Sequence, residues 1–260
     1  MFKILKYSFY DLARSRWSYI YFLFYFILAL VLLFLNHDLS KAVITLMNVI
    51  IILVPLIGTI FGVMYYYNSR EFTELLLAQP IKRKSIFLGQ YLGIAISLSL
   101  SLLLGIGIPF VIYGLFNSAA IWDFSLLLLT GVFLTFIFVA LAFNISIDNE
   151  NKIKGFGYAV LLWLFMAVIY DGLFLMSLVM FEDYPLDKFS LIGSMLNPID
   201  LSRTLILLKL DISVLMGYTG AVFKQYFGTN VGLFTSLGVL FIWIIVPVRR
   251  IVIRAKRKDF

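Results

Sequence analysis

Six long runs of apolar residues constrain this 260-residue chain more than any other feature of its sequence. Each run can cross the roughly 30 Å hydrocarbon core of a bilayer as a helix. A spanning segment must be helical there, because a helix satisfies its own backbone N–H and C=O groups. We therefore predict an all-α polytopic membrane protein with a single transmembrane domain over residues 1–260. The predicted spans are residues 17–35, 42–67, 86–116, 124–147, 155–181 and 231–248.

Composition supports this class and excludes several kinds of site. Apolar residues make up 62% of the chain and charged residues 13%, against roughly half and a quarter in soluble domains. The absence of cysteine excludes disulfides, thiolate metal sites and a cysteine nucleophile. The single histidine, His37, excludes a multi-histidine metal centre. The chain also lacks the Gly-x-x-x-x-Gly-Lys-Ser/Thr sequence that cradles ATP phosphates.

The distribution of basic residues predicts the orientation. Most of the 21 lysines and arginines fall in residues 1–16, 68–84, 152–154 and 249–258, which alternate spans place on one side. Positive charge collects on the cytoplasmic side, so both termini are predicted to be cytoplasmic. The net charge of +7 is then explained by topology, and no nucleic acid partner is expected. The basic tail is predicted to contact anionic lipid.

Residues 1–16 are predicted to form a helix lying on the inner membrane surface. Phe2, Leu5, Phe9 and Leu12 share one helical face, and basic residues lie away from it. The alternative is a basic flank of the first span. Further along, Gly105 and Pro109 in the long third run predict a kink or a break near its outer end.

A short charged segment, residues 68–84, separates the second and third spans. Asn68 is a predicted N-cap, with Glu71 in the capping-box position. Pro80 predicts the end of this helix, and a new helix then leads into the third span. Its apolar ridge either packs on the protein's own helices or enters a groove of another protein. The ridge consists of Phe72, Leu75 and Leu76.

The outer segment, residues 182–230, contains a second helix start. Asn197 is a predicted N-cap, Pro198 lies in the first turn, and Asp200 lies near the positive end of the helix. The leucine and isoleucine pattern that follows predicts an amphipathic helix lying along the outer surface. The pattern consists of Leu201, Leu205, Leu208, Ile212 and Leu215.

Three sets of residues invite functional interpretations. Asp171, beside Tyr170 in the fifth span, could bind a substrate cation, relay a proton, pair across a dimer interface or lock helices together. Met176 and Met180 share a helical face, and could meet copper(I) or fill gaps between helices. His37 and Asp38 are either a weak metal or pH-sensitive site or a solvated turn.

The charged segment resembles the coupling helix of ABC-2 type exporter permeases. Glu74, Leu76, Leu77, Pro80, Ile81 and Arg83 match its pattern, and Glu71 and Phe72 stand where many members have Gly-Thr. The resemblance implies a non-catalytic homodimer served by two cytoplasmic ABC ATPase subunits, which would bind ATP and Mg²⁺. The implied coupling residues are Glu71, Phe72, Glu74, Leu75, Leu76, Leu77, Pro80, Ile81 and Arg83.

Residues 196–203 and 216–223 resemble, more narrowly, the NosY-like permease subunits of nitrous oxide reductase maturation transporters. This resemblance implies a bacterial inner membrane protein that holds a periplasmic partner involved in copper delivery. Copper ligands are expected on partner proteins rather than on this chain. The implied outer contacts are Asn197, Pro198, Asp200, Arg203, Tyr218 and Phe223.

Two other functions compete with a permease. An ion-coupled carrier would use Asp171 as its proton site, but such carriers often show repeated halves, which this sequence lacks. An integral membrane enzyme needs several converging polar groups at one depth. The predicted spans supply one carboxylate and no histidine, so an enzyme is the weaker alternative.

Overall fold

The computed structural model describes residues 1–36, 39–118, 120–181, 187–209 and 230–257, and all the regular structure in these ranges is helical. Six helices are long and apolar enough to cross a membrane, as predicted. The fifth combines α7, a π-helical turn and α8. The spans are α2 (Arg16–Asn36), α3 (Leu39–Asn68), α5 (Arg83–Ile112), α6 (Ile121–Asp148), α7 (Lys152–Leu164) with η2 (Phe165–Ile169) and α8 (Tyr170–Met180), and α12 (Asn230–Arg257).

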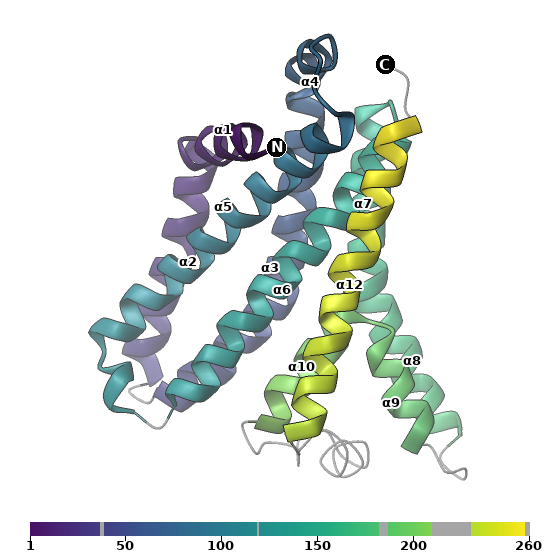
Figure 1. The fold of residues 1–260 in the computed structure, drawn as a ribbon. Coiled ribbons are helices and arrows are strands. Elements are labelled where there is room, and N and C mark those ends of the chain that lie inside the picture. The colour runs from purple at the N-terminus through teal and green to yellow at the C-terminus, as the bar shows by residue number, and fades with distance from the viewer. Residues whose placement is uncertain (37–38, 119, 182–186, 210–229, 258–260) are drawn as a thin grey trace.

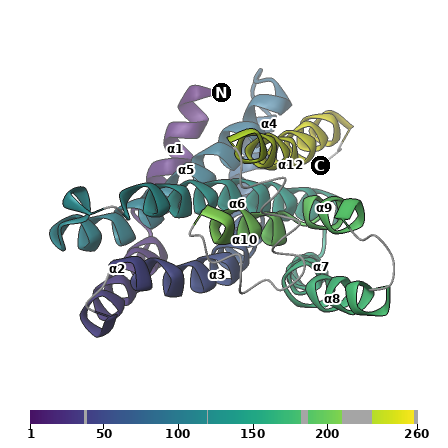
Figure 2. The same ribbon diagram turned by 90° about the horizontal axis from the view of Figure 1, so that it is seen from below.

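The central helices are α3, α5 and α6, and α2, α7–α8 and α12 lie around them (Figure 1, Figure 2). The break expected near Gly105 and Pro109 is absent, because α5 continues unbroken to Ile112. A short 3₁₀ turn, η1 (Leu115–Asn117), follows it. A Cβ atom on Gly105 would lie 3.0 Å from the Phe22 carbonyl oxygen. This glycine therefore lets α2 approach α5 closely rather than breaking the helix.

The N-terminal helix α1 (Phe2–Ala13) lies across the end of the bundle, which confirms that a helix precedes the first span (Figure 1). Its buried face is Ile4, Ser8 and Leu12, whereas Phe2 from the predicted apolar face is exposed. A Cβ atom on Gly93 of α5 would lie 2.7 Å from Ser8 Cβ. Close contact between small residues of α1 and α5 thus determines which face of α1 is buried.

The short helix α4 (Arg70–Leu77) stands beyond the ends of α3 and α5 (Figure 1). It lies at the same end of the bundle as α1 and the C-terminal end of α12. Six spans require the start of α1 and the end of α12 to lie on one side, and they do so here. That this side is cytoplasmic stays a prediction.

At the opposite end, α9 (Asp187–Met195) and α10 (Pro198–Lys209) form a hairpin that turns back into the bundle. Helix α10 packs among α3, α6, α9 and α12 (Figure 2). Five of its side chains, on all sides of the helix, are at most 2% exposed; they are Ile199, Leu201, Ser202, Thr204 and Ile206.

The prediction of an amphipathic helix along the outer surface is therefore wrong for residues 198–209. Small polar residues such as Ser202 and Thr204 complete a helix surface that is compatible with burial on every side. The rest of that predicted helix, including Ile212 and Leu215, lies outside the described residues. So do Tyr218, Phe223, His37 and Asp38, and the side chain of Leu208.

Candidate functional site

The first candidate site is built on α4, whose start differs from the prediction. Asn68 is the last residue of α3, and its Oδ1 accepts a hydrogen bond from Lys152 Nζ at 3.0 Å. Ser69 is the N-cap and makes no side-chain capping bond, so the predicted capping box does not form. α3 continues one residue beyond the end of the predicted span, so Asn68 is its last residue. The predicted end before Pro80 is confirmed, because α4 stops at Leu77.

A buried hydrogen bond fastens α4 to the bundle. Thr73 is only 4% exposed, and its hydroxyl accepts from Gln90 Nε2 of α5 at 2.8 Å. Gln90 is fully buried, and its Oε1 has no hydrogen-bond partner. Sequence reasoning missed this pair. The available signal was a glutamine inside an apolar span, which needs a polar partner when buried.

The predicted ridge of α4 is divided between the protein and its surroundings. The Phe72 ring stacks on Tyr7 of α1, with ring centroids 4.5 Å apart. Leu76 is half-buried, but Leu75 is 68% exposed. Phe72 and Leu76 of this ridge therefore pack on the protein itself, whereas Leu75 faces outward, where a partner could bind.

The charged side chains of the segment face outward. Arg70 Nε donates to Glu74 Oε1 at 3.0 Å in an exposed pair. Leu77 and Ile81 are half-buried; the exposed members of the segment also include Glu71, Pro80 and Arg83. The outer face of α4 is thus one large apolar side chain surrounded by charges.

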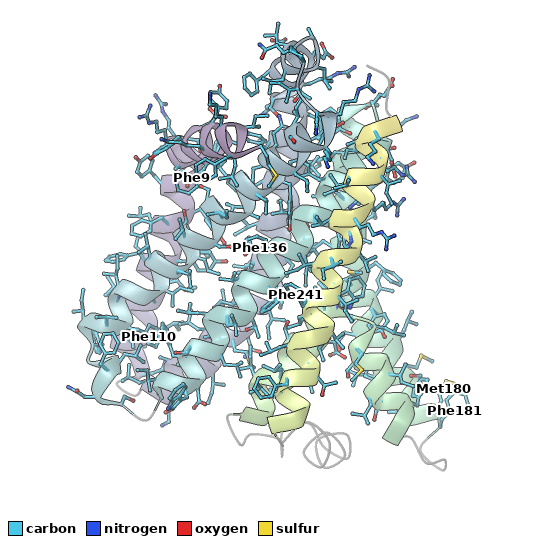
Figure 3. The ribbon with its side chains drawn as sticks, in the orientation of Figure 1. Phe9, Phe110, Phe136, Met180, Phe181 and Phe241 are labelled. Carbon is cyan, nitrogen blue, oxygen red and sulfur yellow. The ribbon has the colours of Figure 1, made fainter. Side chains whose placement is uncertain are left out.

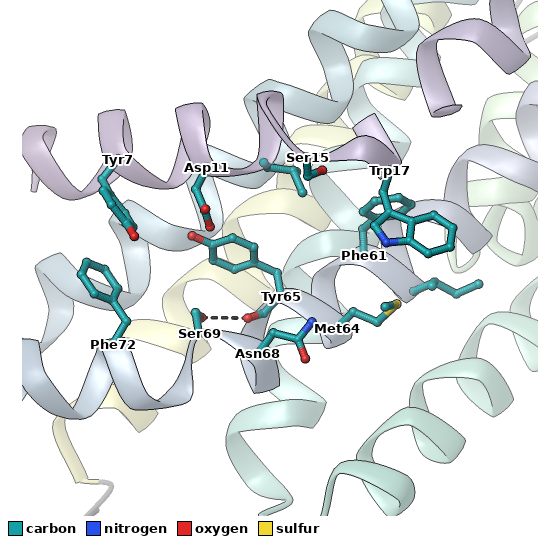
Figure 4. A pocket seen from close by; sticks show the side chains of 12 residues that line it. Tyr7, Asp11, Ser15, Trp17, Phe61, Met64, Tyr65, Asn68, Ser69 and Phe72 are labelled. Carbon is teal, nitrogen blue, oxygen red and sulfur yellow. Dashed lines mark hydrogen bonds between the residues drawn. The ribbon is translucent and has the colours of Figure 1, made fainter. Parts of the chain in front are cut away.

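A pocket of about 580 Å³ lies between α1, the start of α2 and the end of α3, with Phe72 of α4 at one side (Figure 4). Asp11 of α1 and Tyr65 of α3 point toward one another within it, and Trp17 lies at the far side from Phe72. The Tyr65 ring is buried and its hydroxyl makes no hydrogen bond. α4 reaches α1 through the stack of Phe72 on Tyr7 beside this pocket, and it contacts the rest of the bundle at α3 and α5.

The second candidate site joins the fifth span to the hairpin of α9 and α10. Arg203 of α10 donates to Asp171 Oδ2 of α8 at 2.7 Å, and Asp200 Oδ1 lies 3.9 Å from the same nitrogen. The Tyr170 hydroxyl donates to the Gly193 carbonyl of α9. Of the possibilities left open for Asp171, the structure therefore shows an ion pair within the chain, linking two helices.

Burial raises the pKa of the Asp200 carboxyl, which lies outside the six spans, to about 6. The charge of Asp171 adds to this shift and Arg203 opposes it. The Arg203 guanidinium thus lies near two carboxylates, and it is closer to that of Asp171 than to that of Asp200.

Asn197 connects the hairpin to the π-helical turn. Its Oδ1 accepts from Ile199 N at 3.1 Å, which confirms the predicted N-cap. Its Nδ2 donates to the carbonyl of Met166 in η2 at 2.7 Å. Trp243 of α12 donates to the Met195 carbonyl at 3.1 Å, just before the cap. The tip of the hairpin is thus bonded to both the fifth and the sixth span.

The proposed outer contacts that the structure describes are therefore turned inward. Asn197 and Pro198 are buried, Asp200 is 8% exposed, and Arg203 is occupied by Asp171. Met176 and Met180 are exposed side chains of α8, and Met180 is the last residue of that helix (Figure 3). Within the described ranges, no cluster of three His, Cys, Asp or Glu side chains is placed to hold a metal.

Comparison with known proteins points to one group. No family model matches the chain. A protein from Stutzerimonas stutzeri is 27% identical over 134 residues, covering 50% of this chain and 49% of that protein. One from Pseudomonas aeruginosa is 28% identical over 152 residues, covering 55% and 54%. Both bear the name "Probable ABC transporter permease protein NosY".

The chain spans about half the length of each of these relatives. It is similar to ABC transporter permeases of the NosY type, and the resemblance noted from its motifs is confirmed at that level. The six helices and these relatives together indicate a multi-pass membrane protein.

Proposed function

We propose that this chain is the membrane-spanning, non-catalytic permease subunit of an ABC transporter in a bacterial inner membrane. It would act as a homodimer with two cytoplasmic ATPase subunits, which bind ATP and Mg²⁺. The observation that carries the proposal is the exposed Leu75 on α4, a helix that stands clear of the spans. The similarity to two NosY-named permeases supports it.

The composition of the α4 surface suits a partner protein. Leu75 offers an apolar anchor, and Glu71, Arg70 and Glu74 form a charged rim. Interfaces typically combine such a buried apolar centre with a polar rim, and a few residues carry most of the binding energy. Pro80, Ile81 and Arg83 would flank this surface at the start of α5.

The route by which α4 would move the bundle is short. The bond from Gln90 to Thr73 ties α4 directly to α5. α5 in turn packs against α1, α2, α6 and α12. A displacement of α4 by the ATPase would therefore pull first on α5 and, through it, on the helices around it.

At the other end, the proposal extends to a periplasmic partner and to copper-site maturation of nitrous oxide reductase. The hairpin α9–α10 would carry motion of the fifth span outward through Asp171, Arg203 and Asn197. Its buried residues would act on the partner through the segment that follows α10. A proton-coupled carrier is less well supported, because the Asp171 carboxylate is engaged by Arg203.

The test is co-expression of the chain with its ATPase, followed by purification through the chain and an ATP hydrolysis assay. Leu75→Arg is preferred to Leu76→Arg, because Leu75 is exposed and its substitution leaves the packing of α4 intact. Ile153→Arg is the matched control, since Ile153 is 82% exposed at the start of α7. We expect about a tenfold loss of co-purified ATPase activity for Leu75→Arg, the size of a moderate interface hot spot.

Ile153→Arg should retain ATPase activity close to that of the unmodified chain. Equal ATPase recovery with Leu75→Arg and Ile153→Arg would remove α4 as the coupling helix. Purification of the unmodified chain with no ATPase would contradict the permease assignment itself.

A further inference from the structure

A groove of about 630 Å³ lies between α5, α6 and α12, away from both sites described above. Phe136 of α6 and Phe241 of α12 lie on neighbouring helices at its wall (Figure 3). The helices that form it are membrane spans, so the groove lies at the depth of lipid. Its walls include Leu92, Leu129, Phe136, Phe241, Ile245 and Arg249.

The groove offers a ligand almost no polar groups. The Tyr91 hydroxyl lies in its wall, but it already donates to the Phe136 carbonyl at 3.2 Å. Among the described residues that line it, Arg249 alone is charged. An occupant must therefore be apolar along most of its length, because an unpaired polar group buried there would be costly.

Arg249 lies at one end of the groove. Phe241, Ile245 and Arg249 are spaced four residues apart on α12, so they share one helical face. Eight residues of α-helix correspond to about 12 Å, which separates Phe241 from Arg249 along the helix. The charge therefore lies toward the α1 and α4 end, and the apolar walls extend from it toward the middle of the bundle.

The charge of Arg249 is available to a ligand. Its neighbours Arg250 and Arg254 both donate to Asp148 at the end of α6. Among the described residues, Arg249 itself has no carboxylate within ion-pairing distance. An arginine near the membrane surface attracts anionic lipid headgroups, and its aliphatic stem can lie along apolar surface.

We propose that this groove binds an anionic phospholipid from the leaflet on the α1 and α4 side. One acyl chain lies along α12 between Leu129 and Phe241, and the phosphate contacts Arg249. The charge at a single end and the apolar walls match this ligand. The inference does not depend on any ATPase partner.

The test is native mass spectrometry of the purified chain titrated with phosphatidylglycerol or phosphatidylcholine of the same acyl chains. Arg249→Gln should weaken phosphatidylglycerol binding about fivefold, the effect of one basic contact with an anionic headgroup. Lys154→Gln is the matched control, because it removes one positive charge from an exposed position near the start of α7, outside both the groove and the basic tail. It should leave binding unchanged.

A second pair of variants tests the groove rather than the charge. Val132→Phe adds bulk to the groove wall on α6, whereas Leu161→Phe adds a ring at an exposed site on α7. Only Val132→Phe should reduce phosphatidylglycerol binding. Equal binding by Arg249→Gln and Lys154→Gln, or no preference for phosphatidylglycerol over phosphatidylcholine, would overturn the proposal. So would unchanged binding by a folded Val132→Phe chain.

Discussion

The two short helical elements at opposite ends of the bundle, α4 and α10, are held in very different ways. α4 is held by one buried hydrogen bond, from Gln90 to Thr73, and by the stack of Phe72 on Tyr7, which borders a pocket. α10 is buried on all sides, and its Arg203 forms an ion pair with Asp171 of α8. The side chain of its N-cap, Asn197, also donates to a carbonyl of the fifth span.

The difference indicates what each end can do. A helix with few buried contacts opens at low free-energy cost, so it can adapt to a partner. A helix whose polar groups are satisfied only by another span must move with that span, because separating them exposes unpaired charges. α4 is therefore suited to receive a force from outside, and α10 to follow the fifth span.

The largest expected effect comes from removing Arg203 of α10, and removal of Arg70 of α4 is the comparison. Arg203→Leu leaves Asp171 and Asp200 without their shared cation, at side chains only about a quarter exposed or less. We expect a loss of about 2–3 kcal/mol in apparent unfolding free energy in detergent, below the fully buried range because of partial exposure. Arg70→Leu breaks the exposed pair on α4 and should cost less than about 0.5 kcal/mol.

Thermal unfolding of the two variants measures this contrast. Similar midpoints for Arg203→Leu and Arg70→Leu would show that the outer ion pair does not hold the hairpin.

A smaller effect separates two asparagine N-caps. Asn197→Asp retains a capping oxygen but loses the donor to the Met166 carbonyl, so it should cost about 1–2 kcal/mol. Asn151→Asp at the exposed start of α7 keeps both of its capping bonds and should be nearly neutral. Chemical denaturation in mixed micelles compares the two. A neutral Asn197→Asp would mean that the bond to the π-helical turn contributes nothing.

The smallest global effect should come from α4 itself. Thr73→Val leaves Gln90 buried without a partner and should lower the local opening free energy of α4 by about 1 kcal/mol. Hydrogen exchange of residues 70–77 reports this, and the thermal midpoint should hardly change. Adding Gln90→Leu should restore protection, because both polar groups are then gone. Unchanged exchange in Thr73→Val would show that α4 is held by other contacts.

The sequence predicted the spans well because each is a property of one continuous segment. The end of α4 before Pro80 and the N-cap at Asn197 could be predicted for the same reason, because each depends on residues adjacent in the sequence. The position of α10 was not, since burial of Ser202 and Ile199 depends on which helices surround them. The partner of Asp171 was likewise hidden, because Arg203 lies 32 residues away in the chain and only the hairpin brings the two together.

The π-helical turn at Phe165–Ile169 has a consequence for the rotational phase of the fifth span. Such a turn accommodates one more residue than an α-helical turn. Each residue of an α-helix advances the side-chain direction by about 100°. If the same residues formed a regular α-helix, the additional residue would rotate α8 relative to α7 by about that angle. Asp171 and Tyr170 would then be turned away from Arg203 and Gly193, their partners in the hairpin. The alignment of the polar cluster thus depends on the wide turn as much as on the composition of the segment.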